Sequence, residues 1–516
     1  MFDLINAMDN SSSPGVTGWP VKLIKHCATN FARLLSAFMN GIFEIGQIPS
    51  EWKFAIVTPL YKGKGSSTCF DNYRGISVLT PIGKMFERIV SKRIVSYFED
   101  NKLFTSDQHG FRTNHSCETA LASIIDQWKL NLDDNLISLA LFIDFKKAFD
   151  LINPKLLFHK LFHYGFDNFS LALLCDYFED RLQVCKVMDS ISDPTCINIG
   201  VPQGSVLGPL LFLVYINDLS WNIDMKTFLF ADDTTLSDTG TDLEAIISVF
   251  KKKLDPLLNW IDHNQLTINW KKTKFMILAK SKVIDRPGVI KIHNEEIEVV
   301  SVFKLLGVTI DGNLEFHDHV KNIKSMVNRK LFALKKLSFL STPVKVQFFK
   351  SFVLPHFDYC SALVVFLSRK QLNSLEKFYN TCLFRFLNVN IFSLNVFEQK
   401  ICLKKYNILP LKIRFFIKLN TFIYKTINSL CNINIFHNLS FIDREYSRAN
   451  SGQEIVKTPG IVSRYGKSSL SYFLPKFINE ISRNSHNLLF SEFKSSIYCN
   501  LDIQFQLFIN KFNNFI

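Results

Sequence analysis

The sequence has no uninterrupted apolar run of the roughly 18 residues that a membrane-spanning helix needs, and its N-terminus lacks a charged-then-apolar secretion signal. Its 11 cysteines include no C-x-x-C pair and no Cys/His spacing typical of a zinc knuckle. Acidic residues are comparatively few, with 46 Asp and Glu against 60 Lys and Arg, so the net charge is +14. Such a charge could attract a membrane surface, but without a spanning segment we expect no membrane partner. We therefore expect a soluble intracellular protein with reduced thiols, no disulfide partner and a polyanionic ligand.

The length and the apolar content predict several packed domains. The chain has 516 residues, of which 47% are hydrophobic, and this is enough for about two to four domains with substantial cores. Residues 10–15 are typical of a loop, and we expect residues 1–20 to form an N-terminal tail. Periodicity and turn residues then predict an amphipathic helix over 21–45, a strand over 54–60, a helix from Thr80-Pro81, a helix over 117–130, a strand over 137–145, a helix from Pro154 and a helix over 210–219.

Two adjacent aspartates stand in the middle of residues 227–236. An apolar run precedes Asp232 and Asp233 and a β-branched run follows, which predicts strand, turn and strand with both carboxylates at the bend. Adjacent carboxylates beside apolar side chains repel each other and lose solvation, and a divalent cation would offset both costs. Considered alone, the pair fits an exposed acidic turn better than a metal site, so its interpretation depends on the rest of the chain.

A second acidic position ends a strand that we expect to be covered on both faces. Residues 137–145 are nearly all apolar, and Asp144 near their end is costly there unless it has a function or a partner. We favour a functional role for Asp144. Asp150, a little farther along, is interpreted as a helix cap or a turn former.

Basic and glycine-bearing loops supply the other features of a phosphate-handling site. Lys62 and Arg74 lie in such loops, where they either clamp phosphate oxygens or belong to a solvated surface turn. Three glycines and two prolines in residues 200–209 would let the backbone approach a ligand closely, although a plain turn explains them almost as well. Together with the acids, these features are typical of two-metal phosphoryl transfer, in which carboxylates hold two Mg²⁺ ions.

The order of these motifs resembles that of one protein family. The resemblance is carried by residues 59–62, 72–77, 108–112, 144–150, 200–205 and 230–233. Together these segments look like the reverse transcriptases of non-LTR (LINE-type, jockey-like) retrotransposons, from about residue 21 to about residue 340. The resemblance implies an α+β right-hand polymerase with fingers, a palm of antiparallel sheet, a helical thumb and a mostly helical C-terminal region. It also implies RNA-directed DNA polymerase activity, in which a primer 3′-hydroxyl is extended with dNTPs.

The matching positions imply a role for each candidate site residue. Asp144, Asp232 and Asp233 would be the catalytic acids, with Asp144 and Asp232 as ligands of two Mg²⁺ ions, for which Mn²⁺ could substitute. The residues that match the nucleotide-handling motifs are Lys62, Arg74, Phe149, Gln203, Gly204 and Lys272. Among these, Phe149 matches the bulky position that excludes ribonucleotides. Lys272 would protonate the leaving pyrophosphate, and Lys271 and Lys274 are close competitors for that role.

The resemblance also divides the chain and names its partners. Residues 1–20 would be the tail, 21–314 the fingers and palm, 315–400 a thumb-like helical region, and 401–516 a helical region of unknown role. Residues 303–308 resemble a hairpin that holds the primer end. The expected partners are an RNA template, a DNA primer or target and dNTPs, in the nucleus or in a cytoplasmic ribonucleoprotein, with endonuclease activity supplied from elsewhere. Two alternatives stay open: a group II intron maturase-like reverse transcriptase, and an inactive or repurposed nucleic-acid-binding remnant.

Overall fold

Two compact units, each assembled from several chain segments, make up the protein. The computed structural model describes residues 1–280, 285–335, 339–387, 405–428, 441–442, 455–456 and 467–480. Unit 1 consists of Met1–Phe111, Ile143–Thr234 and Lys252–Lys272, and unit 2 of Arg112–Phe142, Thr235–Lys251 and Thr273–Ile516. Within the described ranges, no helix combines the length and the hydropathy needed to cross a bilayer.

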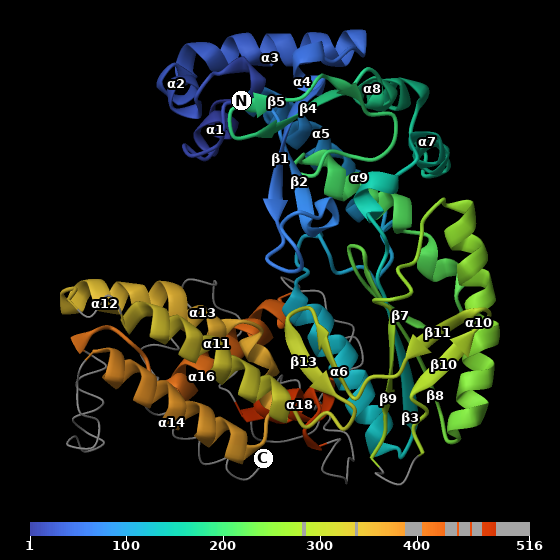
Figure 1. The fold of residues 1–516 in the computed structure, drawn as a ribbon, viewed down its shortest axis with the longest axis vertical. Coiled ribbons are helices and arrows are strands. Elements are labelled where there is room, and N and C mark those ends of the chain that lie inside the picture. The colour runs from blue at the N-terminus through green and yellow to red at the C-terminus, as the bar shows by residue number, and fades with distance from the viewer. Residues whose placement is uncertain are drawn as a thin grey trace. The chain divides into compact units, whose positions relative to one another are not determined.

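Unit 1 contains a mixed sheet and several helices (Figure 1). Its elements are α1 (Phe2–Asn6), η1 (Gly15–Thr17), α2 (Val21–His26), α3 (Ala28–Ile45), α4 (Ser50–Lys53), β1 (Phe54–Tyr61), η2 (Phe70–Asn72), β2 (Tyr73–Val78), α5 (Pro81–Asp100), η3 (Ala148–Leu151), α7 (Pro154–His163), α8 (Asn168–Phe178), β4 (Leu182–Val187), β5 (Ser190–Ile191), β6 (Thr195–Cys196), α9 (Leu207–Ile216), η4 (Leu219–Asn222) and β7 (Lys226–Phe230). The unit boundary crosses α10 (Leu243–His263) and β8 (Asp233–Gly240).

The sheet of unit 1 joins segments that are far apart in the sequence. Its strand order is β2-β1-β4-β5, and β6 also pairs with β4. Strand β1 is antiparallel to β2, with Tyr61 opposite Tyr73, and parallel to β4, with Phe54 opposite Leu182. Lys62 follows β1 directly and Arg74 lies within β2, so one pair of neighbouring strands positions both predicted cations.

Local signals set several boundaries where the sequence predicts them. Thr80 caps α5 by accepting a hydrogen bond from the Gly83 N–H at 3.2 Å, and Pro81 occupies the first helical position. Strands β7 and β8 flank the Ala231-Asp232 turn, which confirms the predicted strand, turn and strand. Helix α9 begins at Leu207, three residues before its predicted start at Leu210.

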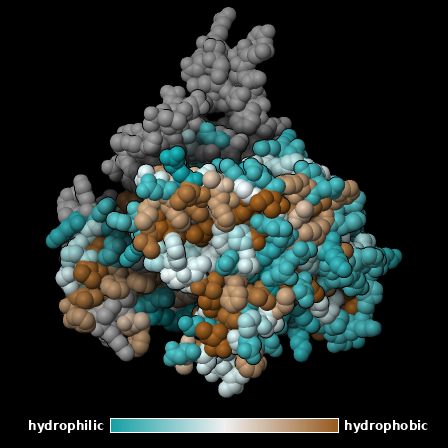
Figure 2. All heavy atoms as spheres, turned by 90° about the horizontal axis from the view of Figure 1, so that it is seen from above, coloured by the Kyte–Doolittle hydropathy of each residue, from teal (hydrophilic) through white to brown (hydrophobic). Residues whose placement is uncertain are grey.

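The N-terminal predictions need correction. Residues 1–20 are not a plain tail, because α1 and η1 form there and the Ile5 side chain of α1 is fully buried. The helix predicted over 21–45 is two helices, since Cys27 leaves helical geometry between α2 and α3. Leu34 and Phe38 of the predicted apolar face are exposed. Apolar residues occur on more than one side of α3, so periodicity alone could not identify its buried face. Figure 2, which views the molecule from above, shows hydrophobic residues at the surface.

Unit 2 contains a second sheet, short hairpins and most of the later helices. Its elements are α6 (Cys117–Asp133), β3 (Ile137–Ile143), β9 (Lys274–Leu278), β10 (Val289–Ile292), β11 (Glu295–Glu298), β12 (Val302–Leu305), β13 (Val308–Asp311), α11 (His317–Lys335), α12 (Thr342–Phe348), η5 (Phe349–Val353), α13 (Leu354–Asp358), η6 (Ser361–Phe366), α14 (Arg369–Phe386), α16 (Leu411–Ile427), β14 (Phe441–Ile442), β15 (Ile455–Val456) and α18 (Leu470–Glu480). Most of β8 also belongs to this unit.

Strands β8, β3 and β9 are neighbours in that order in the sheet of unit 2. Strand β3 is antiparallel to β9, with Ser138 opposite Leu278, and every residue of β3 is buried. This burial confirms the expectation of a covered apolar strand, and it places Asp144 just past the strand end rather than inside it. Residues 303–308 lie in the β12–β13 hairpin, whose turn is formed by Leu306 and Gly307 with positive φ values.

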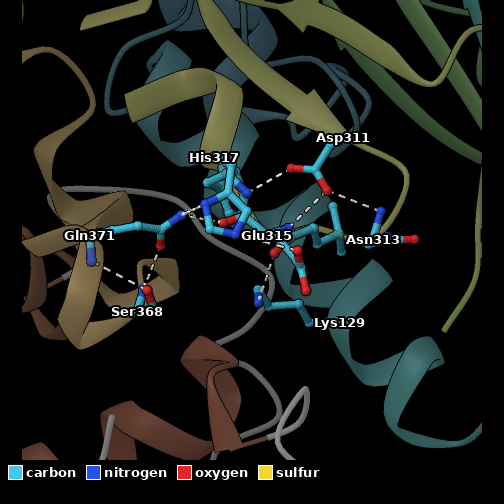
Figure 3. Close-up of polar contacts among 9 residues, drawn as sticks. Lys129, Asp311, Asn313, Glu315, His317, Ser368 and Gln371 are labelled. Carbon is cyan, nitrogen blue, oxygen red and sulfur yellow. Dashed lines mark hydrogen bonds and ion pairs between the residues drawn. The ribbon is translucent and has the colours of Figure 1, made fainter. Parts of the chain in front are cut away.

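A polar network joins the β12–β13 hairpin to the helices that follow it (Figure 3). The Asp311 carboxylate accepts hydrogen bonds from the backbone N–H groups of Asn313 and Glu315 at 3.1 and 3.0 Å. Gln371, part of the capping box of α14, donates to the Glu315 carbonyl at 2.6 Å. The buried Lys129 ammonium of α6 also approaches this linker. The start of α11 is therefore fixed to both α6 and α14.

Candidate active site

A pocket of about 710 Å³ in unit 1 brings together most of the predicted site residues. The predicted residues that line it are Lys62, Arg74, Asp144, Phe149, Gln203, Gly204, Asp232 and Lys272. Asp233 is the exception: it is exposed at the first position of β8 and, in the part of the chain that the structure describes, stands outside the lining. Unit 1 thus collects residues from chain positions 62 to 272 around one cavity.

Asp144 is held at the pocket by the segment that follows α10. The Asn269 side-chain amide donates to Asp144 Oδ2 at 2.9 Å, and the Asn269 N–H donates to the Asp144 carbonyl at 2.7 Å. Lys272 Nζ lies 3.5 Å from Asp144 Oδ2, and its side chain is 70% exposed. A pair this exposed contributes little to stability, so the ammonium stays available to a ligand.

Asp232 is positioned by a strained turn with a buried support. Ala231 before it has a φ of +55°, an uncommon conformation for a residue with a side chain. The Gln108 side-chain oxygen accepts hydrogen bonds from the Ala231 N–H at 2.9 Å and from the Gly110 N–H at 2.8 Å. A Cβ atom at Gly110 would lie 2.3 Å from the Ala231 nitrogen, so only glycine allows this approach. Residues 108–110 therefore fix the backbone that presents Asp232.

The two acidic positions influence each other electrostatically. Burial raises the pKa of Asp232, the nearby Asp144 carboxylate raises it further, and the Arg74 guanidinium opposes the rise. Desolvation and the carboxylates of Asp232 and Asp144 raise the pKa of Asp233 to about 6.

The two predicted cations reach the pocket from the β1–β2 hairpin. Lys62 Nζ donates to the Asp71 carbonyl at 2.7 Å, which holds the ammonium at the pocket rim. Arg74 is exposed within β2, and its charge acts on Asp232. Phe70 and Tyr73 also line the cavity. The cavity therefore offers positive charge and aromatic side chains to an anionic ligand with a planar group.

Phe149 and Asp150 form another part of the wall. Phe149 packs against Phe212 of α9, with ring centroids 4.7 Å apart. The interpretation of Asp150 as a helix cap was wrong, because Asn153 caps α7 through its bond to the Lys155 N–H. Asp150 instead lines the pocket, and its Oδ1 accepts a hydrogen bond from Gln203 Nε2 at 2.8 Å. It thereby orients the amide of Gln203.

The glycine-rich loop over 200–208 is tied to its surroundings at several points. The Gly200 and Val201 N–H groups donate to the carbonyls of Ile152 and Phe149, and the Ser77 N–H donates to the Gln203 carbonyl at 2.7 Å. Gly204 has a φ of +130°, and a Cβ atom there would lie 2.5 Å from the Ser77 carbonyl oxygen. Glycine is therefore required at position 204 both for conformation and for space.

Of the three candidate lysines near position 272, the structure brings Lys272 to the pocket. Lys274 instead pairs with Glu298 at 2.8 Å in the sheet region of unit 2. Lys271 is exposed and stands outside the pocket lining in the described residues. The geometry favours Lys272 over its competitors, while its chemical role stays a prediction.

The donor chemistry of the pocket suits magnesium. Mg²⁺ is usually bound by one or two carboxylates, with substrate phosphates and water as further ligands, and Asp144 and Asp232 supply two carboxylates. Within the described residues, no group of three or more His, Cys, Asp or Glu side chains is arranged to hold a metal without such help. The residues therefore fit a metal whose coordination is completed by a phosphate ligand.

Three residues of the site carry no individual signal in the sequence: Gln108, Asn269 and Asp150. Gln108 and Asn269 act on partners 123 and 125 positions away. Asn269 stands in the motif that suggested Lys272, and Gln108 in a motif used for the resemblance, but neither reveals its partner. Asp150 does form a turn, because it lies in η3 and its N–H donates to the Lys147 carbonyl at 2.8 Å, but its contact with Gln203 has no local signal.

The described elements form an α+β structure consistent with the right-hand polymerase fold. Residues 62–310 match the family model "Reverse transcriptase (RNA-dependent DNA polymerase)", and this part of the chain is a reverse transcriptase domain. The resemblance to non-LTR retrotransposon enzymes is thereby confirmed. The match lies entirely within residues 21–314, the region predicted for fingers and palm.

Curated relatives from fruit fly extend the comparison beyond this domain. The RNA-directed DNA polymerase from mobile element jockey of Drosophila melanogaster is 26% identical over 72% of this chain and 42% of its own length. Probable RNA-directed DNA polymerases from transposon BS and transposon X-element of the same species are each 27% identical, over 62% and 69% of this chain and 36% and 40% of theirs. The chain therefore spans about two fifths of the length of these relatives. A solved apo telomerase from Candida tropicalis aligns over 54% of this chain and 58% of its own, at 11% identity and a TM-score of 0.34, too low to support an argument.

Proposed function

We propose that the chain is an RNA-directed DNA polymerase that extends a DNA primer on an RNA template with dNTPs. The single observation that carries this proposal is the pocket in which Asp144 and Asp232 face the cations Lys62, Arg74 and Lys272. In the reaction, the primer 3′-oxygen forms a bond to the α-phosphorus of the dNTP and the bond to pyrophosphate breaks. The proton of the primer 3′-hydroxyl would pass to water.

The residues of the chain would handle the triphosphate from two sides. Lys62 and Arg74 would bind its phosphate oxygens, with lysine as a point charge and arginine as a fork. Lys272, which is 3.5 Å from Asp144 and largely exposed, would give a proton to the departing pyrophosphate. These cations would stabilise the negative charge that develops on the phosphate oxygens in the transition state.

Asp144 and Asp232 would hold Mg²⁺, or Mn²⁺ in its place. The metal supplies activation of the attacking oxygen and neutralisation of charge on the leaving oxygen when it is bound. Asn269 would keep Asp144 in its orientation, and the Ala231 turn would keep Asp232 in place. Asp233 would act through its charge rather than as a ligand, because it lies outside the pocket lining in the described chain.

Phe149 and Gln203 would select the sugar and orient the nucleotide. The Phe149 ring rests on Phe212 and so cannot easily retreat from a 2′-hydroxyl. Gln203 donates to Asp150 through Nε2, so the side-chain oxygen of Gln203 can accept a hydrogen bond from another donor. Template and primer would be held mainly through phosphates, so binding should weaken steeply with salt. The supply of a nicked target by a separate endonuclease stays a prediction.

The decisive experiment is primer extension by the purified chain on an RNA template with Mg²⁺ and all four dNTPs. The parent is compared with Asp232→Ala and with Asp262→Ala, which removes an exposed carboxylate of α10 outside the pocket. We expect extension by the parent and by Asp262→Ala, and none by Asp232→Ala. If all three proteins bind the primed template equally and none extends it, the chain is a nucleic-acid-binding protein and the polymerase proposal fails.

A further inference from the structure

A buried acid behind the pocket belongs to no motif that the proposed function uses. Glu87 lies on α5 and is 3% exposed. Its Oε2 accepts hydrogen bonds from the Val206 N–H at 2.5 Å and the Leu207 N–H at 3.3 Å, and its Oε1 accepts one from the Tyr177 hydroxyl at 3.2 Å. A carboxylate in such a place loses solvation worth several kcal/mol, so its partners must compensate for that loss.

The partners of Glu87 suit a carboxylate. The Val206 and Leu207 N–H groups are at the N-terminus of α9, where the first backbone donors of a helix have no partner within it and the helix dipole favours negative charge. Arg181 is also buried, with 1% exposure, and lies over the Tyr177 ring at 4.6 Å while donating to the Tyr177 carbonyl. Burial raises the pKa of Glu87, while the hydrogen bond from the Val206 N–H and the positive charge of Arg181 oppose that rise.

The two N–H groups that Glu87 binds lie a short way along the chain from the pocket. Gln203 and Gly204 line the cavity, Ser205 follows, and Val206 and Leu207 are the N-cap and first residue of α9. Upstream, the Ser77 N–H holds the Gln203 carbonyl at 2.7 Å. The pocket end of the loop is thus clamped on one side by β2 and on the other by Glu87.

The same bonds explain why α9 starts earlier than the sequence predicts. A helix that begins at Leu207 leaves the N–H groups of residues 206–208 without partners inside the helix, and Pro209 has no N–H. Glu87 takes two of them and the Ser205 hydroxyl takes the N–H of Gly208 at 3.0 Å. The capping acid comes from 119 positions away, so no local pattern reveals it.

We propose that Glu87, supported by Tyr177 and Arg181, is a positioning residue that fixes the Gln203-Gly204 segment for the incoming nucleotide. This inference rests on the proposed polymerase function. Glu87 does not touch the pocket, because it acts through the backbone of the loop. Its loss should weaken nucleotide binding without removing a group that contacts the substrate.

Glu87→Gln is the sharpest variant because it keeps the size and one acceptor but removes the charge. We expect its KM for dNTP to rise about tenfold, the effect of weakening a charged hydrogen bond, with little change in the affinity for primed template. Hydrogen–deuterium exchange over residues 203–208 should become faster. Tyr177→Phe removes only the hydrogen bond to Glu87 Oε1. It should raise the KM for dNTP and the exchange rate by smaller amounts, and it replaces Glu87→Gln as the test variant if Glu87→Gln does not fold.

Asp176→Asn is the matched control. Asp176 is the neighbour of Tyr177 on α8 and accepts from the Ile48 N–H at 2.7 Å and from Lys53 Nζ at 2.9 Å, away from the glycine-rich loop. It should lower the melting temperature without changing the KM for dNTP. The double variant Glu87→Gln/Gln203→Ala should be no worse in KM than Gln203→Ala alone, because both changes act on one contact.

The results separate this inference from the proposed function. A parent without primer extension rejects the polymerase proposal, and exchange over 203–208 still decides whether Glu87 anchors the loop. Unchanged exchange in Glu87→Gln overturns the anchor. Faster exchange with an unchanged KM in an active enzyme overturns the positioning role, and so does an equal rise in KM for Asp176→Asn.

Discussion

Replacing Gln108 by methionine should damage both stability and catalysis. Gln108 is 1% exposed, and its side-chain oxygen is the acceptor for two buried N–H groups, those of Gly110 and Ala231. Methionine keeps the volume but cannot replace that acceptor. A buried donor left without a partner costs about 1–3 kcal/mol, so we expect Gln108→Met to lower the free energy of unfolding by about 2–6 kcal/mol.

The catalytic effect follows from the position of the Ala231 N–H, one residue before Asp232. Relaxation of this turn moves the Asp232 carboxylate, and each 1.4 kcal/mol of lost positioning corresponds to about a tenfold lower rate. We therefore expect kcat in primer extension to fall by about tenfold or more, with unchanged affinity for primed template. Urea denaturation and single-nucleotide extension measure the two effects.

Gln127→Met is the control for this substitution. Gln127 is an exposed residue of α6 whose amide donates only to the Asn131 side chain in the bonds described. Substitutions of exposed residues usually alter the free energy of unfolding by less than about 0.5 kcal/mol. Wild-type stability and kcat in a folded Gln108→Met protein would refute the argument that Gln108 supports the Asp232 turn.

Three further perturbations test other parts of the structure. Phe149→Val should admit ribonucleotides because it removes the ring that rests on Phe212; unchanged sugar selectivity in an active enzyme would remove Phe149 from that role. Asn269→Ala should lower kcat at constant template affinity, since Asp144 loses its 2.9 Å hydrogen bond; a kcat equal to that of the parent would contradict this. Burial raises the pKa of Asp126 to about 6. The folded state therefore binds more protons than the unfolded state between about pH 4 and 6. The free energy of unfolding should fall by about 3 kcal/mol as pH rises through that window. Asp126→Asn should flatten this fall in urea titrations at several pH values, and an unchanged slope would reject the assignment.

Short-range patterns in the sequence predicted the parts of the fold that depend on short-range physics. The Thr80-Pro81 start of α5 is a local cap, and the strand, turn and strand around Asp232 needs only neighbouring residues to be recognised. Asp144 was found because an acid at the end of a fully apolar strand is costly wherever the strand packs. The break at Cys27 was missed, because apolar spacing continues across it from α2 to α3.

The supports of the site could not be predicted in the same way. Glu87, Gln108 and Asn269 each bind a backbone or carboxylate partner more than a hundred positions away, and each would be an ordinary polar residue of its own segment. Asp150 forms a turn, as one of its two interpretations predicted, yet no local pattern indicates its distant partner, Gln203. The sequence therefore indicated most of the predicted site residues that line the pocket but not the residues that hold them in place.

The assembly of unit 1 from three chain segments constrains when it can fold during synthesis. Strand β1 must wait for β4, whose residues follow it by more than a hundred positions, and Asp144 receives its support from Asn269 only later. Long loop closure of this kind makes folding slow and leaves the early helices exposed while the ribosome works. A nascent chain that ends between residues 233 and 271 contains Asp144 and Asp232 yet lacks Lys272, so its pocket lining is incomplete. Truncated mRNAs that end in this interval should therefore yield chains that need chaperones and are degraded. They should not yield a partially active product.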